Sequence, residues 1–311
     1  MDIYKNKNRF LQYEMWKDCH LGCKFCCNKG APDLNKKQSL TFILEKLDEE
    51  EVADFNEIGF IGGEFFNGEI EDITVRSLFY KVFDKCAKMI NSGTKDKLYI
   101  TTALEYDMDL YLIPFLNHLK EKGILDKTLI CTSYDIAYRF HTQEREDLWK
   151  HNMLKLHELY PELGLHTEII MTQFFIDAVL NDEFSITAFQ EKYHTRCDYI
   201  EPASGLYWKD KQDCAKDLPG FFPTKASYTK FLYKVAENNE IDFNTFLSME
   251  LRSSKLYYID GGQRLVVDNR RDTNGAAVPL DTTKKYEIGL IDSDQTMRSI
   301  AIKVKEILGI E

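Results

Sequence analysis

The chain has 311 residues, of which 44% are hydrophobic and 29% charged, and its formal net charge is -11. This composition is typical of a soluble globular protein and excludes a disordered, collagen-like or disulfide-scaffold chain. The negative charge disfavours nonspecific binding to nucleic-acid phosphates or to an anionic membrane surface. No run approaches the roughly 18 apolar residues of a membrane span, and the start lacks an apolar signal segment, so we expect a cytoplasmic protein.

Short apolar β-prone runs alternate with longer segments of helical spacing over the first two thirds of the chain. We predict strands at 10–16, 57–61, 97–102, 128–133, 167–173 and 198–201. We predict helices at 40–55, 74–91, 107–122, 144–159 and 182–193, with Gly123 as a helix C-cap. Because the spacings leave room for right-handed crossovers, the pattern predicts an α/β fold, a partial (β/α)6 TIM-like barrel with parallel strands. Catalytic groups are then expected at the carboxyl ends of the strands.

The pattern changes near residues 219–223, which contain two prolines and a glycine. Beyond them we predict a helix at 228–236, a hairpin of 256–259 with 265–267, and a last helix at 296–308. The predicted organisation is therefore a barrel core at 1–222 and a small C-terminal α+β extension at 223–311. Residues 215–311 contain no cysteine.

Three cysteines, Cys19, Cys23 and Cys26, form a Cys-x3-Cys-x2-Cys motif directly after the first predicted strand. Eight cysteines in the whole chain are too few for a disulfide framework, so this spacing indicates metal ligation. A structural zinc site needs four protein ligands, and Cys27 or His20 are the candidates to complete one. A 4Fe-4S cluster held by three cysteines instead leaves one iron open for an exogenous ligand. The position after a strand favours the second interpretation, since it is where barrel enzymes keep their active sites.

The cysteine motif, with Phe25 just before the last cysteine, resembles the signature of the radical S-adenosylmethionine (radical SAM) enzymes. This resemblance implies that Cys19, Cys23 and Cys26 hold one 4Fe-4S cluster, and that the open iron chelates the methionine amino and carboxylate groups of S-adenosylmethionine. It also places Phe25 near the adenine. Reduction by an external flavodoxin-type or ferredoxin-type donor would then yield a 5'-deoxyadenosyl radical that abstracts a substrate hydrogen.

A second motif, Gly62-Gly63-Glu64, ends the second predicted strand. Two glycines let a backbone approach a ligand closely, and a carboxylate can accept hydrogen bonds from an ammonium group. An ordinary turn is the alternative for such a tripeptide. The motif resembles the family's Gly-Gly-Glu-Pro, which holds the methionine amino group, although Phe65 stands in place of the proline.

Other polar residues end the remaining strands. Ser133 and Asp135 are similar to the family's Ser-x-Asp, which contacts the ribose or carboxylate, while a turn or helix N-cap suits them equally. Thr102 and Thr172 occupy positions where the family contacts the cofactor. Glu201, at the end of the sixth strand, is a candidate polar contact with cofactor or substrate, or a structural residue. The sequence assigns no catalytic residue.

The resemblance covers roughly residues 10–205 and predicts a radical SAM enzyme. The predicted hairpin resembles that of peptide-modifying members, which suggests a peptide or protein substrate. A nucleotide or another small metabolite is the alternative substrate. A non-enzymatic zinc or iron-sulfur binding module is the alternative of a different class.

Overall fold

The computed structural model describes residues 10–19, 21–26, 36–48, 55–66, 68, 70–197, 200–202, 218–238, 254–259, 265–269 and 294–309. Two candidate zinc ligands, His20 and Cys27, and the side chain of Glu201 lie outside this part of the chain. Among the described helices, none combines the length and the apolar character needed to cross a membrane.

A sheet with the strand order β6-β5-β4-β3-β2-β1-β7-β8 forms the centre of the molecule. The strands before the C-terminal region are β1 (Phe10–Glu14), β2 (Glu57–Ile61), β3 (Lys97–Thr101), β4 (Thr128–Tyr134), β5 (Gly164–Met171) and β6 (Ile200–Pro202). Each pairs in parallel with its neighbour, which confirms the predicted parallel sheet. The predicted α/β class, with strands and helices alternating along the chain, is also confirmed.

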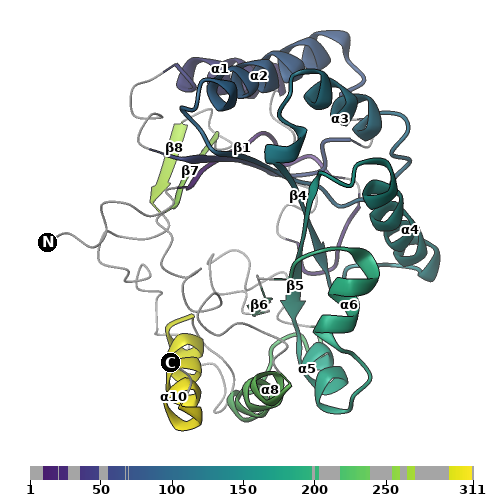
Figure 1. The fold of residues 1–311 in the computed structure, drawn as a ribbon, viewed down its shortest axis with the longest axis vertical. Coiled ribbons are helices and arrows are strands. Elements are labelled where there is room, and N and C mark those ends of the chain that lie inside the picture. The colour runs from purple at the N-terminus through teal and green to yellow at the C-terminus, as the bar shows by residue number, and fades with distance from the viewer. Residues whose placement is uncertain are drawn as a thin grey trace, which may run out of the picture.

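The helices between these strands follow one another along one side of the sheet, from α1 and α2 beside β1 to α5 and α6 beside β5 (Figure 1). They are α1 (Lys36–Lys46), α2 (Ile73–Asn91), α3 (Leu112–Glu121), the 3-10 turn η2 (Leu125–Lys127), α4 (Gln143–Leu159), α5 (Gln173–Leu180) and α6 (Ile186–Tyr193). Gly123 follows α3 with a φ of 71°, as expected of a glycine after a helix end. This arrangement of helices outside a sheet is consistent with a partial barrel.

Aromatic side chains fill the space between the sheet and α2 and α3. The rings of Phe79 and Phe83 lie 4.8 Å apart, and Phe83 meets Phe115 at 4.7 Å in an edge-to-face pair. All three side chains are fully buried. Such pairs add to the free energy gained by removing their area from water. The core thus holds the sheet rigidly from the helix side.

The helix predicted at 182–193 corresponds to α6, which begins four residues later at Ile186, and the preceding helix α5 (Gln173–Leu180) was not predicted. Thr172 caps α5 by accepting a hydrogen bond from Phe175 N at 3.2 Å, and Ser185 caps α6 from Ala188 N at 3.2 Å. The apolar sequence of α5 continues the apolar run of β5 without a glycine or proline between them. The capping hydroxyls, rather than the hydrophobic pattern, mark the change from strand to helix.

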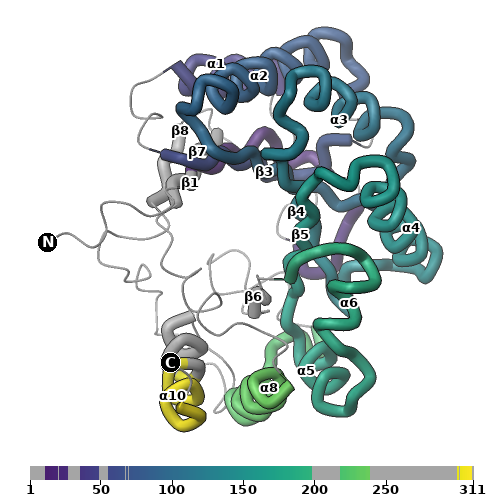
Figure 2. The backbone as a smooth tube through the Cα atoms, in the orientation of Figure 1, coloured from purple at the N-terminus to yellow at the C-terminus, as the bar shows by residue number. Residues whose placement is uncertain are grey.

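The C-terminal elements are α8 (Lys225–Glu237), β7 (Ser254–Ile259), β8 (Leu265–Asn269) and α10 (Asp294–Leu308). β7 and β8 pair antiparallel, and β7 also pairs in parallel with β1. The hairpin therefore continues the sheet beyond its first strand. α8 packs beside α5 (Figure 2), where the rings of Phe175 and Phe231 are 5.8 Å apart.

Candidate functional site

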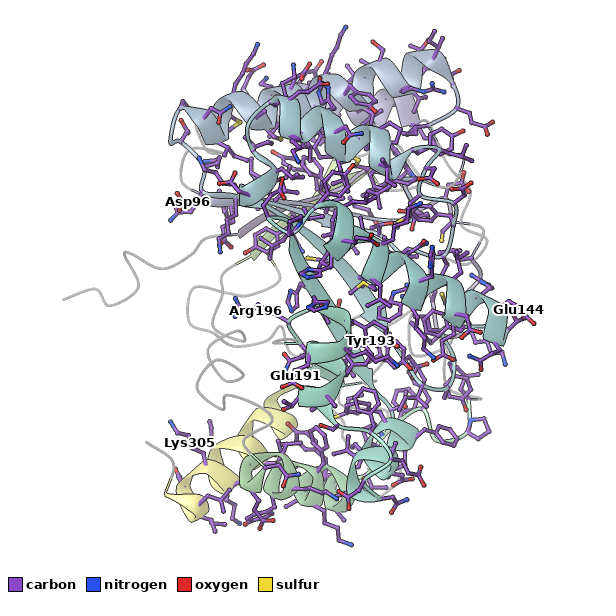
Figure 3. The ribbon with its side chains drawn as sticks, turned by 45° about the vertical axis from the view of Figure 1, so that its right-hand side comes forward. Asp96, Glu144, Glu191, Tyr193, Arg196 and Lys305 are labelled. Carbon is purple, nitrogen blue, oxygen red and sulfur yellow. The ribbon has the colours of Figure 1, made fainter. Side chains whose placement is uncertain are left out.

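The parallel strands have all their amino ends at one edge of the sheet and all their carboxyl ends at the opposite edge. The predicted site residues lie at the carboxyl edge. Figure 3 shows Asp96, which precedes β3, and Glu144, in the first turn of α4 after β4, at opposite sides of the molecule. The first marks the amino edge of the strands and the second the carboxyl edge. The cysteine loop, which we define as residues 19 and 21–26, follows β1 and so lies at the carboxyl edge.

The end of β2 packs against the backbone that leads into the cysteine loop. Gly63 N donates to Trp16 O at 2.7 Å, and Glu64 N donates to Asp18 O at 3.1 Å. A Cβ added to Gly62 would lie 2.2 Å from Trp16 O, and one added to Gly63 would lie 1.8 Å from Asp18 O. Neither contact is sterically allowed, so both positions require glycine. The close approach predicted from these glycines is thus made to the chain's own backbone.

Glu64 is a buried residue whose carboxylate links the ends of β2 and β3 through hydrogen bonds. Its side chain is 1% exposed. One carboxylate oxygen accepts hydrogen bonds from Phe65 N, Phe66 N and Thr102 Oγ1 at 2.8, 3.0 and 2.8 Å, and the other accepts from Ala103 N at 2.6 Å. Burial raises the pKa of Glu64, and these donors oppose the rise. The sequence did not reveal this structural role, because the donors come mostly from backbone amides.

The two predicted threonine contacts also have partners within the chain. Thr102 is buried, and its hydroxyl lies 2.6 Å from Tyr106 Oη in addition to its bond to Glu64. Thr172 is buried as well and serves as the N-cap of α5. Both side chains therefore stabilise the strand ends.

The segment between β4 and α4 holds the cysteine loop from the other side. Lys24 N donates to Tyr138 O at 3.4 Å, and Arg145 donates from a terminal guanidinium nitrogen to Leu21 O at 3.0 Å. His141 Nε2 lies 2.7 Å from Gly22 O. The loop itself is consequently bonded to the β4–α4 segment and the start of α4, while the residues that lead into it are bonded to the end of β2.

Ser133 and Asp135 organise the turn that makes those contacts. Asp135 accepts hydrogen bonds from Tyr138 N and from Arg139 N, the latter at 3.0 Å, and Ser133 Oγ accepts one from the Arg139 guanidinium. Burial raises the pKa of Asp135, and the amide donors of the turn oppose that rise. These are the contacts expected of a turn. Asp135 is 1% exposed, whereas Ser133 is half-buried.

Cys19, Cys23 and Cys26 are all partly exposed thiols. Cys26 N donates to Cys23 O at 3.0 Å and closes a tight turn between the last two. Burial raises the pKa of the Cys23 thiol, while Arg139 lowers it. Within the described part of the chain, no three His, Cys, Asp or Glu side chains form a group suited to one metal ion.

Phe25 belongs to a small aromatic cluster that adjoins the cysteine loop. Its ring stacks on Phe221 with centroids 5.6 Å apart, and Tyr138 meets Phe221 at 5.9 Å. The Tyr138 hydroxyl also donates to Pro219 O. The segment before α8 therefore covers one side of the loop with apolar rings, which would exclude water there.

The inner face of the sheet, away from the helices, carries polar side chains. Along β4, Thr132 and Tyr134 are buried toward α4, where Trp149 Nε1 donates to Thr132 Oγ1 at 3.0 Å. The alternate residues Cys131 and Ser133 point the other way and are half-buried. Their register partners on β5, His166 and Glu168, are half-buried too. The row of polar groups thus crosses from one strand to the next.

Comparison with known proteins does not assign this chain to a family. Neither a protein-family model nor a curated protein matches this chain. The function has to be inferred from the residues of the site.

Proposed function

We propose that this chain is a radical SAM enzyme in which Cys19, Cys23 and Cys26 hold one 4Fe-4S cluster. The observation that carries the proposal is the position of the three thiols on one loop at the carboxyl edge of a parallel sheet. That edge is where α/β enzymes keep their catalytic groups. The loop is bonded to the start of α4 and its entry to the end of β2, which helps to preorganise it for a ligand.

The donor set fits an iron-sulfur cluster. Thiolate sulfurs are the ligands that such clusters use, and three partly exposed ones stand within eight residues. Each thiolate binds a different iron in a cluster, so the sulfurs need not converge on one point as they must around zinc. When bound, the cluster and S-adenosylmethionine supply a 5'-deoxyadenosyl radical that abstracts hydrogen from the substrate.

The side chains at the carboxyl edge divide into two groups in this proposal. Phe25 and Ser133 remain half-buried, and we assign them direct contact with S-adenosylmethionine. The buried polar residues, Glu64, Thr102, Asp135 and Thr172, act by fixing the strand ends. Gly62 and Gly63 keep the β2 end close to the entry of the cysteine loop. The aromatic cover of Phe25 and Phe221 shields the reaction from water.

The proposed substrate is a peptide or protein, bound at the inner face of a partial (β/α)6 TIM-like barrel. The polar side chains on the inner faces of β4 and β5 support a substrate that is itself polar. A nucleotide or other small metabolite is the alternative. A flavodoxin-type or ferredoxin-type protein would supply the electron.

The first test is anaerobic reconstitution with iron and sulfide, followed by reduction with dithionite in the presence of S-adenosylmethionine. We expect a brown protein with four irons per chain that forms 5'-deoxyadenosine. Cys23→Ala should lose the cluster and the cleavage, while Cys86→Ala, a change of a fully buried thiol in α2, should keep both. A colourless protein that holds one tightly bound zinc would refute the proposal.

The second test addresses the substrate. Deuterated peptides and deuterated nucleotides are offered to the reconstituted enzyme, and 5'-deoxyadenosine is examined by mass spectrometry. Deuterium transferred from a peptide supports the proposed class. Transfer from a nucleotide alone would overturn it and leave the radical chemistry standing.

A further inference from the structure

A buried carboxylate, Glu105, lies between two arginines beside the cysteine loop. Its side chain is 0% exposed. Glu105 Oε1 is 3.4 Å from Arg139 Nε. Glu105 Oε2 is 2.7 Å from a terminal guanidinium nitrogen of Arg145. Within the described part of the chain, none of these atoms makes an aligned hydrogen bond. The group is therefore held by charge in a poorly solvated place, with two positive charges on one negative charge.

The backbone that presents Glu105 is strained. Leu104 has a φ of 59°, in the left-handed region that a leucine rarely adopts. Asn152 Nδ2 donates to Leu104 O and to Tyr106 O at 2.9 Å each, so it clamps the backbone on both sides of Glu105. Strain of this kind persists where the surrounding structure fixes it, and it is frequent at functional sites.

The two arginines connect Glu105 to the residues of the candidate site. Arg145 donates to Leu21 O, in the middle of the cysteine loop, at 3.0 Å. Arg139 donates to Ser133 Oγ and, at 2.8 Å, to Ala103 O. Each guanidinium thus donates a hydrogen bond to a residue of the candidate site, and each also forms an ion pair with Glu105. Both arginines and Glu105 also interact electrostatically with Cys23.

We propose that Glu105 is a positioning residue of the candidate site: it fixes Arg145, which holds the cysteine loop, and Arg139, which holds Ser133, and the three groups together set the charge beside the loop. The part of the proposal that concerns a cluster rests on the proposed function. Reduction adds one negative charge to a cluster, so nearby positive charge favours the reduced state and negative charge disfavours it. Glu105 then makes the cluster harder to reduce, and the arginines make it easier.

Glu57 offers a matched control. It is also a buried glutamate, 5% exposed, but it begins β2 and so lies at the amino edge, away from the cysteine loop. Glu57→Gln and Glu105→Gln each remove one buried negative charge with little change in shape. A difference between the two variants in amide exchange or in reduction potential therefore depends on where the removed charge lies.

The first measurement is hydrogen-deuterium exchange of the protein without cofactors. We expect Glu105→Gln to speed exchange of the amides of Leu21–Cys26 several-fold, because the amide group of glutamine cannot hold both guanidiniums. Glu57→Gln should leave these amides as in the wild type. Equal exchange in Glu105→Gln and the wild type would overturn the positioning role.

The second measurement is the reduction potential of the reconstituted protein. Glu105→Gln should shift it to a more positive value, and Arg139→Gln to a more negative one. Arg145→Lys, which keeps the charge but loses the forked contact, should speed exchange of the loop and leave the potential near that of the wild type. This variant also keeps the proposal testable if Glu105→Gln does not fold.

The outcomes separate the two proposals. A wild-type chain that takes up no cluster refutes the proposed function, while the exchange of residues 21–26 still decides whether Glu105 positions the loop. If the cluster forms and the potential of Glu105→Gln equals that of the wild type, Glu105 does not set the charge of the site.

Discussion

Gly63 faces the carbonyl of Asp18 so closely that an added Cβ would lie 1.8 Å from its oxygen. Gly63→Ala must therefore push apart β2 and the entry of the cysteine loop. We expect it to lower both the free energy of unfolding and the iron taken up on reconstitution. Gly93→Ala is the control, since its Cβ would meet nothing within 4 Å although its φ of 75° costs about 1 kcal/mol. Iron uptake in Gly63→Ala equal to that in Gly93→Ala would contradict the steric account.

Glu64→Gln should destabilise the protein even without cofactor. The carboxylate accepts four hydrogen bonds, and a glutamine would turn its NH2 group toward one or more of these donors. We expect a loss of about 2 kcal/mol in urea unfolding, and about 1 kcal/mol for Thr102→Val, which removes one donor. A fully stable Glu64→Gln would show that the carboxylate is not a structural anchor. Loss of activity in a Glu64 variant is thus no proof of cofactor contact.

Alkylation of the thiols in the cofactor-free protein should distinguish the three cysteines of the motif from Cys86. Burial raises the pKa of Cys86 to about 12, so it stays protonated and inaccessible at pH 8. Cys19, Cys23 and Cys26 are partly exposed and should react first. A reconstituted cluster should protect these three, and removing it with a chelator should restore their reaction. Mass spectrometry of tryptic peptides measures the pattern, and early labelling of Cys86 would argue against the buried α2 face.

The cap of α2 predicts a pH dependence. Asp72 accepts hydrogen bonds from Val75 N and Thr74 N, which lower its pKa, and it pairs with Lys37 at 3.3 Å. A lowered folded pKa means that the carboxylate stabilises the fold above the unfolded value of 3.8 and that this gain disappears as pH falls through the folded pKa. The stability of the wild type should exceed that of Asp72→Asn at pH 6.

This excess should vanish once the pH has fallen through the lowered folded pKa of Asp72, where both side chains are neutral. Asp72→Ala, which also loses the cap, should stay less stable than Asp72→Asn throughout the range. Thermal unfolding at several pH values measures both differences. A gap between wild type and Asp72→Asn that does not change with pH would rule out the charge of Asp72 as its source.

The sequence predicted well those parts of the fold that repeat a pattern. The run at 57–61 matches β2, a short strand buried along nearly its whole length. The helix predicted at 144–159 begins one residue after α4, because burial on one face of a helix leaves a periodic trace in the sequence. The boundary between β5 and α5 left no such trace. Apolar residues continue across it, and the hydroxyl of Thr172 makes the difference through a bond that periodicity does not show.

The sequence predicted that the candidate site residues lie at the ends of the strands, as they do, but it did not predict the bonds among them. The cysteine spacing and the glycines after β2 identified the carboxyl edge, since these residue types are tied to local geometry. Glu105 escaped notice because it belongs to no motif. Its importance arises from Arg139 and Arg145, which lie 34 and 40 positions along the chain and come near it through the crossover of α3 and the return of β4. Such contacts follow from topology, which single-sequence patterns specify loosely.

The parallel pairing of β1 with β7 has a consequence for synthesis of the protein. Phe10 lies opposite Ser254, so the outer edge of β1 has no partner until the chain beyond Tyr257 has left the ribosome. An unpaired strand edge invites association with other chains during this interval. We expect nascent or truncated chains that lack residues 254–257 to depend on chaperones. The strand that leads into the cysteine loop is made long before β7, yet its pairing is completed only when β7 has been made.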